Sequence, residues 1–117
     1  MPTEPTPGPI LPPATIGILG GGQLGRMLGF AARAMGYRIR VLDPDPGCPA
    51  ASIADHVETG SYRDVDAAVR MADGCSVVTY ELEHIDAAIV EALLPRLPVR
   101  PGLQPLRVTQ DRLAERR

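Results

Sequence analysis

The sequence predicts an α/β fold in which a parallel sheet of four or five strands lies between two layers of helices. Two observations support this fold class. Short apolar and β-branched runs alternate along the 117 residues with segments whose apolar side chains recur at helical spacing. In addition, a glycine-rich turn at residues 20–25 (GGGQLG) joins the first of these runs directly to the first helical segment. Strands that alternate with helices pair in parallel, because each helix carries the chain back to the start of the next strand.

Each predicted element follows from a local signal. The strands are short apolar or β-branched runs at residues 15–19, 38–42, 56–59, 76–80 and around Val99. The helices have apolar residues three and four positions apart, at residues 24–35, 65–72, 85–93 and 104–116. The first three helices stop near Gly36, Gly74 and Pro95. Pro105 lies in the first turn of the fourth helix, where proline is well tolerated. The prolines of residues 43–50 (DPDPGCPA) predict a loop.

The glycine-rich turn is the strongest functional signal in the chain. A turn of this kind presents the amides at the start of a helix to a phosphate or another anion. Gly20 permits the tight turn, Gly22 leaves the backbone open to a ligand, and Gly25 lets the helix pack closely on the strand. Gln23 opens the helix with an amide that can donate and accept hydrogen bonds, unless it is simply a solvated residue of the first turn. Rossmann-like domains for nicotinamide, flavin and nucleotide substrates all use this turn, so the turn alone does not decide the function.

Two further segments are expected to meet the glycine-rich turn, because ligands of open parallel sheets bind beyond the carboxyl ends of the strands. Asp43 lies 18 residues after Gly25, where a dinucleotide domain carries its ribose acceptor. Its proline-rich surroundings equally predict a turn-forming loop cap. Tyr80 and Glu81 directly follow an apolar strand. A carboxylate there either accepts hydrogen bonds from an amine or ribose hydroxyls, or is a surface charge of the loop.

Composition argues against several classes of function. The formal net charge is -2 and the pI is about 5.6, so no basic surface indicates a nucleic-acid partner. All 12 basic residues are arginine, so the chain has no lysine for a Walker-type phosphate site or a Schiff base. The sequence contains no apolar run of 18 residues, which argues against a membrane partner.

The cysteines, histidines and N-terminus carry weaker signals. Cys48 and Cys75 have no metal-ligand spacing and are predicted to be free thiols. His56 and His84 are predicted to be surface or strand-edge residues, so no metal site is expected. Residues 1–14 contain six prolines and lack the features of a signal peptide. They are predicted to form a disordered leader of a cytoplasmic protein.

Taken together, five segments resemble the N-terminal domain of the N5-carboxyaminoimidazole ribonucleotide synthases, a family of the ATP-grasp superfamily. The segments are residues 18–28 (ILGGGQLGRML), 36–50 (GYRIRVLDPDPGCPA), 54–57 (ADHV), 77–85 (VVTYELEHI) and 99–113 (VRPGLQPLRVTQDRL). The resemblance implies a pre-ATP-grasp domain with a Rossmann-like substrate-binding part at residues 15–102. Residues 103–117 would form a helix or linker toward an ATP-grasp domain, and the chain is expected to be truncated before that domain.

The resemblance also implies a reaction. In the whole enzyme, ATP would phosphorylate bicarbonate, and the exocyclic amine of 5-aminoimidazole ribonucleotide would then attack the carboxyl carbon. The product would be N5-carboxyaminoimidazole ribonucleotide, an intermediate of de novo purine (IMP) biosynthesis. ATP and magnesium would be bound mainly by the absent ATP-grasp domain, and the whole enzyme would be a homodimer. The 117 residues alone are expected to be inactive and to hold no catalytic residue.

Matching positions imply roles for six residues. Those expected to line the ribonucleotide pocket are Gly22, Gln23, Leu24, Tyr80 and Glu81. Arg112 is expected to contribute to ATP binding. Two alternatives from other functional classes remain. A nicotinamide-dependent oxidoreductase would use the glycine-rich turn for pyrophosphate and Asp43 for ribose, and a non-catalytic module would only sense a nucleotide.

Overall fold

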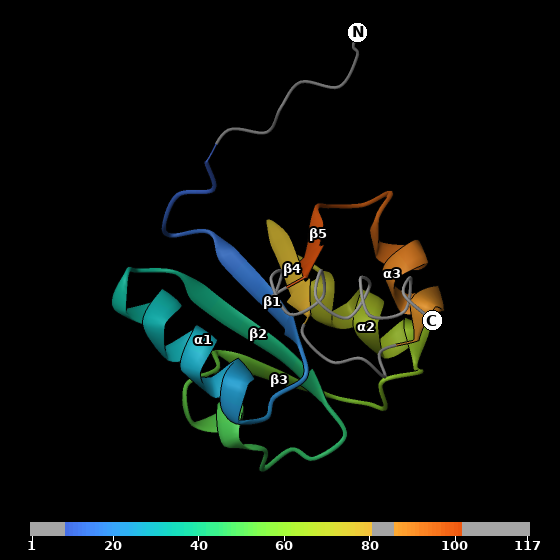
Figure 1. The fold of residues 1–117 in the computed structure, drawn as a ribbon, viewed down its shortest axis with the longest axis horizontal. Helices are drawn as coiled ribbons and strands as arrows, with labels where there is room; N and C mark the ends of the chain where they lie inside the picture. Colours follow the sequence, from blue (N-terminus) through green and yellow to red (C-terminus); the bar gives the residue numbers. More distant parts are fainter. Residues whose placement is uncertain (1–8, 81–85, 102–117) are drawn as a thin grey trace, which may run out of the picture.

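A five-stranded parallel sheet forms the centre of the computed structural model, which describes residues 9–80 and 86–101 (Figure 1). The strands are β1 (Thr15–Leu19), β2 (Arg38–Asp43), β3 (His56–Thr59), β4 (Val77–Tyr80) and β5 (Val99–Pro101). The helices are α1 (Gln23–Ala34), α2 (Val65–Ala72) and α3 (Ala87–Leu93), with a 3-10 helix η1 (Pro49–Ser52). These elements confirm the predicted α/β class. The predicted helix at 104–116 lies outside the described residues.

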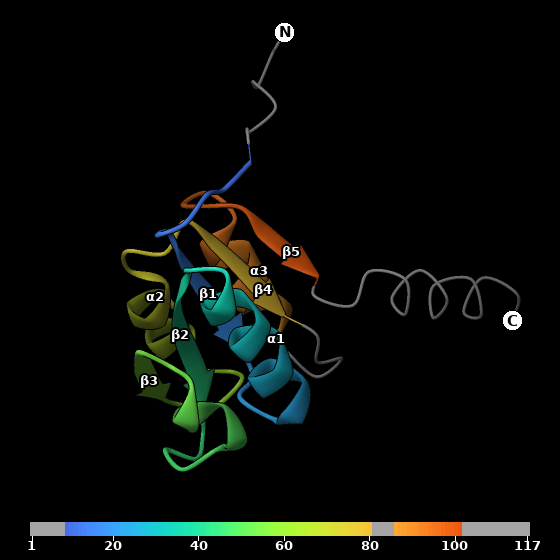
Figure 2. The ribbon, with the colours of Figure 1, turned by 90° about the vertical axis from the view of Figure 1, so that its left-hand side faces the viewer.

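The helices cover the two faces of the sheet, which confirms the three-layer arrangement. Figure 2 shows α1 and α2 on opposite sides of the sheet. Alternate strand residues point to opposite faces, so Ile18 packs with α1 and η1 while the next residue, Leu19, packs with α2 and α3. The cluster on the α1 side contains Ile18, Ala32, Ile39, Val41, Cys48 and Ala50. The larger cluster on the other side contains Leu19, Leu42, Ala67, Ala68, Met71, Ala72, Val78, Ile89 and Leu93.

The strand order β3-β2-β1-β4-β5 places a topological switch point between β1 and β4. From β1 the chain moves outward to β2 and β3, and it then crosses to β4 on the other side of β1. The carboxyl ends of β1 and β4 therefore lie side by side at the edge of the sheet where open α/β sheets bind their ligands. Leu19 pairs with Tyr80 in the register of these two strands, so the glycine-rich turn begins beside the end of β4.

Two local differences from the sequence analysis concern the chain outside the strands. The predicted loop at 43–50 contains the start of η1, whose first residue, Pro49, is suited to the first turn of a helix. The end of the predicted leader contacts the domain: the Tyr37 hydroxyl donates a hydrogen bond to the Ile10 carbonyl, and the Arg38 amide donates one to the Ala14 carbonyl at 3.0 Å. The boundary of the domain thus lies before residue 15. Residues 1–8 lie outside the described part.

The helices of the described ranges are all too short or too polar to cross a membrane.

Candidate functional site

The turn after β1 is shaped by close backbone contacts. Gly20 has φ of 111°, a conformation that side-chain-bearing residues rarely adopt, and its amide donates a hydrogen bond to the Leu42 carbonyl at 2.9 Å. A Cβ atom at Gly25 would overlap the carbonyl oxygen of Gly20. Both glycines are therefore needed for α1 to begin so close to β1, as the sequence analysis predicted.

Gly21 is fixed from both sides. Its amide donates to Oδ2 of Asp43 at 2.9 Å, and its carbonyl accepts a hydrogen bond from the Ala50 amide at 2.9 Å. A Cβ atom at this position would lie 2.5 Å from Sγ of Cys48 and 2.9 Å from Val41. The turn is thus held against β2 and η1 before it reaches α1.

Asp43 is a loop cap, one of the two roles that the sequence left open. Its side chain is buried, with 7% of the residue exposed, and it accepts three hydrogen bonds from the protein. The donors are the Gly21 amide, the Tyr62 hydroxyl at 2.6 Å and the Asp45 amide at 2.9 Å. A carboxylate occupied in this way joins three loops at the carboxyl edge of the sheet and is not presented to a ribose.

Tyr62 is a residue of this network that the sequence analysis did not identify. Burial first, and then its hydrogen bond to the Asp43 carboxylate, raise the pKa of the Tyr62 phenol above its ordinary value. The hydroxyl therefore stays a neutral donor. The position of Tyr62 in the sequence could have indicated this role. Tyr62 lies three residues after the end of β3, and the loop after each strand of a parallel sheet leaves from this same edge. Cys48, which packs beneath Gly21, was predicted to be a free thiol and is one.

Gly22 differs from its neighbours, because neither packing nor backbone conformation requires glycine there. A Cβ atom at Gly22 would meet no atom of residues 9–80 or 86–101 within 4 Å, and the φ of -74° at Gly22 is open to any residue. Gly22 is the N-cap of α1, and no side chain of the described residues caps this helix or places an acid in its first turn. Gln23 and Leu24 are both exposed. The amides of the first turn of α1 are consequently open to an anion from outside.

The N-termini of α2 and α3, in contrast, are both capped by a side chain. Asp64 caps α2 by accepting a hydrogen bond from the Ala67 amide at 3.0 Å, and Asp86 caps α3 through the Ala88 amide at 2.9 Å. Of the three α-helices described, only the one that follows the glycine-rich turn keeps its amides free of a side-chain cap. An uncapped helix start of this kind can accept an anion in place of a capping side chain.

The end of β4 forms the other part of the predicted site, and the structure describes it as far as Tyr80. Tyr80 ends β4 beside the glycine-rich turn, but its side chain packs against the cluster on the α2 side of the sheet. The structure thus brings the backbone of Tyr80 to the predicted place and directs the ring away from α1. Glu81, His84 and Arg112 lie outside the described residues.

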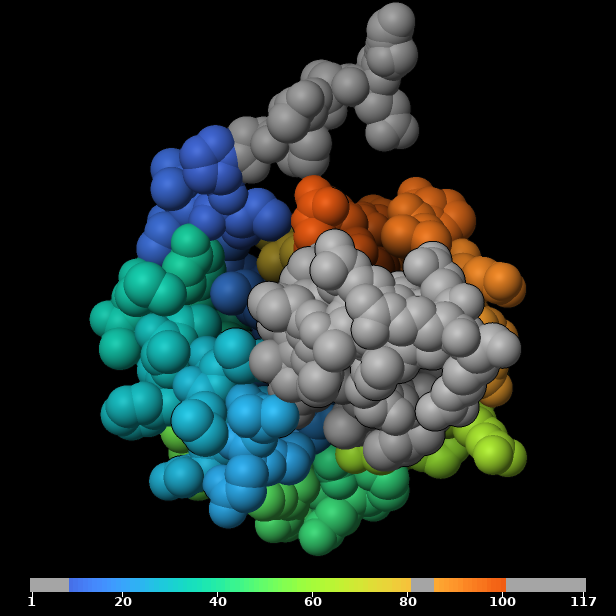
Figure 3. All heavy atoms as spheres, viewed as in Figure 1, coloured from blue at the N-terminus to red at the C-terminus, as the bar shows by residue number. Residues whose placement is uncertain are grey.

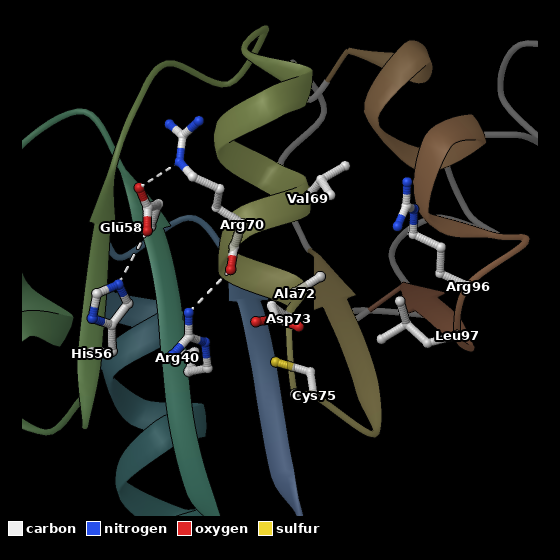
Figure 4. Close-up of a pocket in the computed structure, with 11 residues that line it drawn as sticks. Arg40, His56, Glu58, Val69, Arg70, Ala72, Asp73, Cys75, Arg96 and Leu97 are labelled. Atoms are coloured by element: carbon white, nitrogen blue, oxygen red, sulfur yellow. Dashed lines mark hydrogen bonds and ion pairs between the residues drawn. The ribbon is translucent and has the colours of Figure 1, made fainter.

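A hollow of about 640 Å³ lies away from this edge, between β2, β3 and the end of α2 (Figure 4). Four of the charged or titratable side chains that line it have partners within the fold. Arg40 donates to the carbonyls of Met71 at 2.7 Å and Arg70 at 3.0 Å, and Glu58 accepts from Arg70 and from His56, both at 3.1 Å. His56 is accordingly an exposed strand-edge residue, as predicted. These contacts satisfy carbonyl groups at the end of α2 and join this helix to the strands β2 and β3.

Cys75 lines the same hollow. Burial raises the pKa of its thiol to about 11, so it stays protonated at neutral pH and is a poor nucleophile. Gly22, Gln23, Leu24 and Tyr80, the described residues predicted to bind the ribonucleotide, do not line this hollow.

Comparison with known proteins agrees with this geometry. A family model described as the ribonucleotide synthetase preATP-grasp domain matches residues 13–110. N5-carboxyaminoimidazole ribonucleotide synthase from Staphylococcus aureus (strain COL) is 41% identical over 103 residues, which are 88% of this chain and 28% of that protein.

Two solved structures show the same fold. N5-carboxyaminoimidazole ribonucleotide synthetase from Thermus thermophilus has a TM-score of 0.72 and 44% identity, over 86% of this chain and 28% of that one. N5-carboxyaminoimidazole synthase from Aspergillus clavatus, in complex with ADP and 5-aminoimidazole ribonucleotide, has a TM-score of 0.68 and 38% identity, over 80% and 25%. The chain therefore spans less than a third of the length of these relatives.

Proposed function

The chain belongs to the ribonucleotide synthetase preATP-grasp domain family, and we propose that it is the substrate-binding domain of an ATP-dependent carboxylating ligase. The ligase would convert 5-aminoimidazole ribonucleotide and bicarbonate to N5-carboxyaminoimidazole ribonucleotide in purine biosynthesis. The observation that carries this proposal is the uncapped first turn of α1 at the switch point of the sheet. It is supported by the names of the relatives, one of which was solved with this ribonucleotide.

The phosphate of the ribonucleotide is proposed to bind the first turn of α1. Amides at Gly22, Gln23 and Leu24 point out of the helix start, and the partial positive charge there favours an anion. Since no side chain of the described residues fills the space above Gly22, an oxygen of the phosphate can approach the backbone closely there. The exposed amide of Gln23 would add a hydrogen bond to the ribose or the phosphate.

The aminoimidazole is proposed to lie toward the end of β4. Glu81 follows β4 directly and would accept hydrogen bonds from the amine or the ribose hydroxyls, while Tyr80 anchors this strand end through its packing on the α2 side. The contribution of this domain would be orientation: it holds the amine where an activated carboxyl group arrives. No residue of the domain is assigned a proton transfer.

ATP, magnesium and bicarbonate are assigned to the remainder of the longer enzyme. Arg112 would reach ATP from the start of the linker. The part of the chain that the structure describes has no cluster of three acidic, histidine or cysteine side chains suited to a metal ion, so magnesium would be held elsewhere. When bound, it would neutralise the phosphates of ATP. The whole enzyme is proposed to be cytoplasmic and a homodimer.

The experiment that tests the substrate assignment is a titration of the 117-residue chain with 5-aminoimidazole ribonucleotide, ATP and NADH. We expect saturable binding of the ribonucleotide and none of NADH. Gly22→Val should abolish ribonucleotide binding, because a branched side chain would cover the amides, while the circular dichroism spectrum stays that of the folded domain. Gly47→Val is the matched control, since Gly47 is also exposed and a Cβ atom there would meet only Asp45, at 3.5 Å.

Three outcomes would contradict the proposal. Unchanged ribonucleotide affinity in the folded Gly22→Val variant would remove the turn from the site. Preferential binding of NADH would favour the oxidoreductase alternative. Binding of ATP alone would favour a nucleotide-sensing module.

A further inference from the structure

Tyr62 is bound to two different parts of the carboxyl edge of the sheet. Its hydroxyl donates a hydrogen bond to Oδ2 of Asp43 at 2.6 Å, and its carbonyl accepts one from the Asp86 amide at 3.2 Å. Asp86 is the N-cap of α3, the helix that follows β4. One residue of the loop between β3 and α2 therefore links the end of β2 to the start of α3.

The loop that carries Tyr62 is itself fixed by its backbone. The Gly60 amide donates a hydrogen bond to the Asp43 carbonyl, and the Asp64 amide donates one to the Ser61 carbonyl, both at 3.1 Å. A Cβ atom at Gly60 would lie 2.6 Å from an atom of α2, so the loop begins in direct contact with this helix. The sheet and α2 thus set the position from which the Tyr62 hydroxyl donates.

The Tyr62 hydroxyl and the Gly21 amide share one oxygen of Asp43. Both donate to Oδ2, whereas Oδ1 accepts from the Asp45 amide. The terminal torsion of an aspartate is soft, so its hydrogen bonds decide where each oxygen lies. Tyr62 therefore fixes the oxygen that places Gly21, the residue just before the N-cap of α1. In Figure 3 the light-blue atoms of α1 and the green atoms of the segment after β2 both reach the molecular surface on the face shown.

We propose that Tyr62, acting through Asp43, is a positioning residue of the phosphate site: it sets the direction of the amides in the first turn of α1. This inference rests on the proposed function, because the ligand is the phosphate of the ribonucleotide. Several amides bind one phosphate well only if they point to one place. A small rotation of the turn at Gly21 weakens all of these hydrogen bonds together.

Titration of the 117-residue chain with 5-aminoimidazole ribonucleotide, under conditions where every variant is folded, tests the proposal. Tyr62→Phe keeps the ring and removes only the hydroxyl, and it should raise the dissociation constant about three- to thirtyfold. Asp43→Asn makes the shared oxygen a weaker, uncharged acceptor, so it should raise the dissociation constant as well. This second variant serves if Tyr62→Phe does not fold.

Tyr37→Phe is the matched control. Tyr37 is also half-buried, and its hydroxyl also donates one hydrogen bond, to the Ile10 carbonyl. Tyr37 directly precedes β2, so this bond lies at the amino edge of the sheet, away from the glycine-rich turn. The control variant should lower the free energy of unfolding about as much as Tyr62→Phe does and leave the dissociation constant unchanged.

Amide NMR spectra of the ligand-free chain make the test independent of the substrate assignment. The signals of residues 21–24 should shift in Tyr62→Phe and stay in place in Tyr37→Phe, because only the first variant releases the shared oxygen of Asp43. Inorganic phosphate, titrated against the same signals, should bind more weakly to Tyr62→Phe than to the unmodified chain. An unmodified chain that binds neither probe would contradict the proposed function, and the ligand-free signals would still decide whether Tyr62 positions the turn.

Three results would overturn the positioning role. A dissociation constant unchanged in Tyr62→Phe would leave Tyr62 a structural residue, even if the amide signals shift. Equal weakening by Tyr37→Phe would show that affinity follows overall stability. Signals of residues 21–24 that stay in place in Tyr62→Phe would show that the hydroxyl does not place the turn.

Discussion

At the scale of single residues, Asp43 organises the edge of the sheet where the ligand site is proposed. One buried carboxylate holds the glycine-rich turn, the loop after β2 and the loop after β3 by accepting a hydrogen bond from each. A buried acceptor with three donors is costly to disturb, because each donor left unpaired loses its solvation without a compensating hydrogen bond. The open position of Gly22 depends on this network, since Gly21 is fixed by it.

The Asp43 network predicts a graded loss of stability. Asp43→Asn removes the charge and one acceptor oxygen, so the free energy of unfolding should fall by about 1–3 kcal/mol, and Tyr62→Phe should cost about 1 kcal/mol. Urea denaturation measures both. Asp45→Asn is the control, since Asp45 is exposed and its Oδ1 can still accept from the Gly47 amide. Equal losses for Asp43→Asn and Asp45→Asn would mean that the network does not stabilise the edge.

At the scale of elements, α1 combines an uncapped start with a small inner face. No side chain of the described residues caps its first turn, and the glycines facing the sheet bring the helix close to β1 and β2. This close approach fixes where the first turn of the helix lies relative to the switch point. The large apolar residues of α1 are consequently left on its outer side.

The two inner glycines of α1 should respond differently to alanine. A Cβ atom at Gly25 would overlap a backbone carbonyl, whereas at Gly29 it would overlap the flexible end of the Ile53 side chain. Backbone cannot move without displacing β1 or α1, so Gly25→Ala should lower the free energy of unfolding by about 1–3 kcal/mol. Gly29→Ala should be near neutral, because the gain in helix propensity, about 0.5–1 kcal/mol, offsets a rearrangement of Ile53.

Urea denaturation of the two variants, with m-values compared, provides the measurement. A larger loss for Gly29→Ala than for Gly25→Ala would show that α1 and β1 can separate more easily than Ile53 can move.

At the scale of the whole molecule, the order of the strands brings together the two parts of the proposed site. The ends of β1 and β4 are far apart in the sequence, yet the register of Leu19 with Tyr80 places them side by side. The same order leaves β3 at one edge of the sheet, where His56, Glu58 and Arg70 form a chain of ion pairs. The ligand edge and this charged edge are separate features of one sheet.

Stability of the whole domain should decrease as the pH falls below the ordinary carboxyl range. Hydrogen bonds from His56 and Arg70 lower the pKa of Glu58 below its ordinary 4.5, and hydrogen bonds from the Ile39 amide and Arg33 lower the pKa of Asp55 below its ordinary 3.8. A carboxyl with a depressed folded pKa stabilises the protein above its unfolded pKa, and this contribution disappears as the pH falls through the folded value.

The pH prediction can be isolated at one residue. Glu58→Gln should reduce the free energy of unfolding at neutral pH, and the difference from the unmodified chain should vanish at low pH. Glu91→Gln, at an exposed position of α3, is the control and should show no such convergence. A Glu58→Gln difference that is constant with pH would show that its ion pairs contribute nothing.

The sequence by itself determined the fold class, the order of nearly every element and the glycine-rich turn. These follow from local physics: apolar periodicity separates strands from helices, and glycine and proline mark where each helix stops. The roles of Gly20 and Gly25 could also be predicted, since a tight strand-to-helix turn requires them at that spacing. The proposed substrate came from the resemblance of five segments to one family, because the spacing of apolar residues carries no information about a substrate.

Only the tertiary structure decided which of these residues share an environment. It assigned Asp43 to the protein rather than to a ribose, because the donors to its carboxylate come from three loops and lie up to 22 positions away from it in the sequence. It showed that no described residue fills the space above Gly22, and it turned the Tyr80 side chain toward α2. It also left the large residues of α1 exposed, although their spacing alone fits a buried face. Burial and hydrogen bonding are properties of neighbours in space, and sequence spacing fixes such neighbours only within a single element.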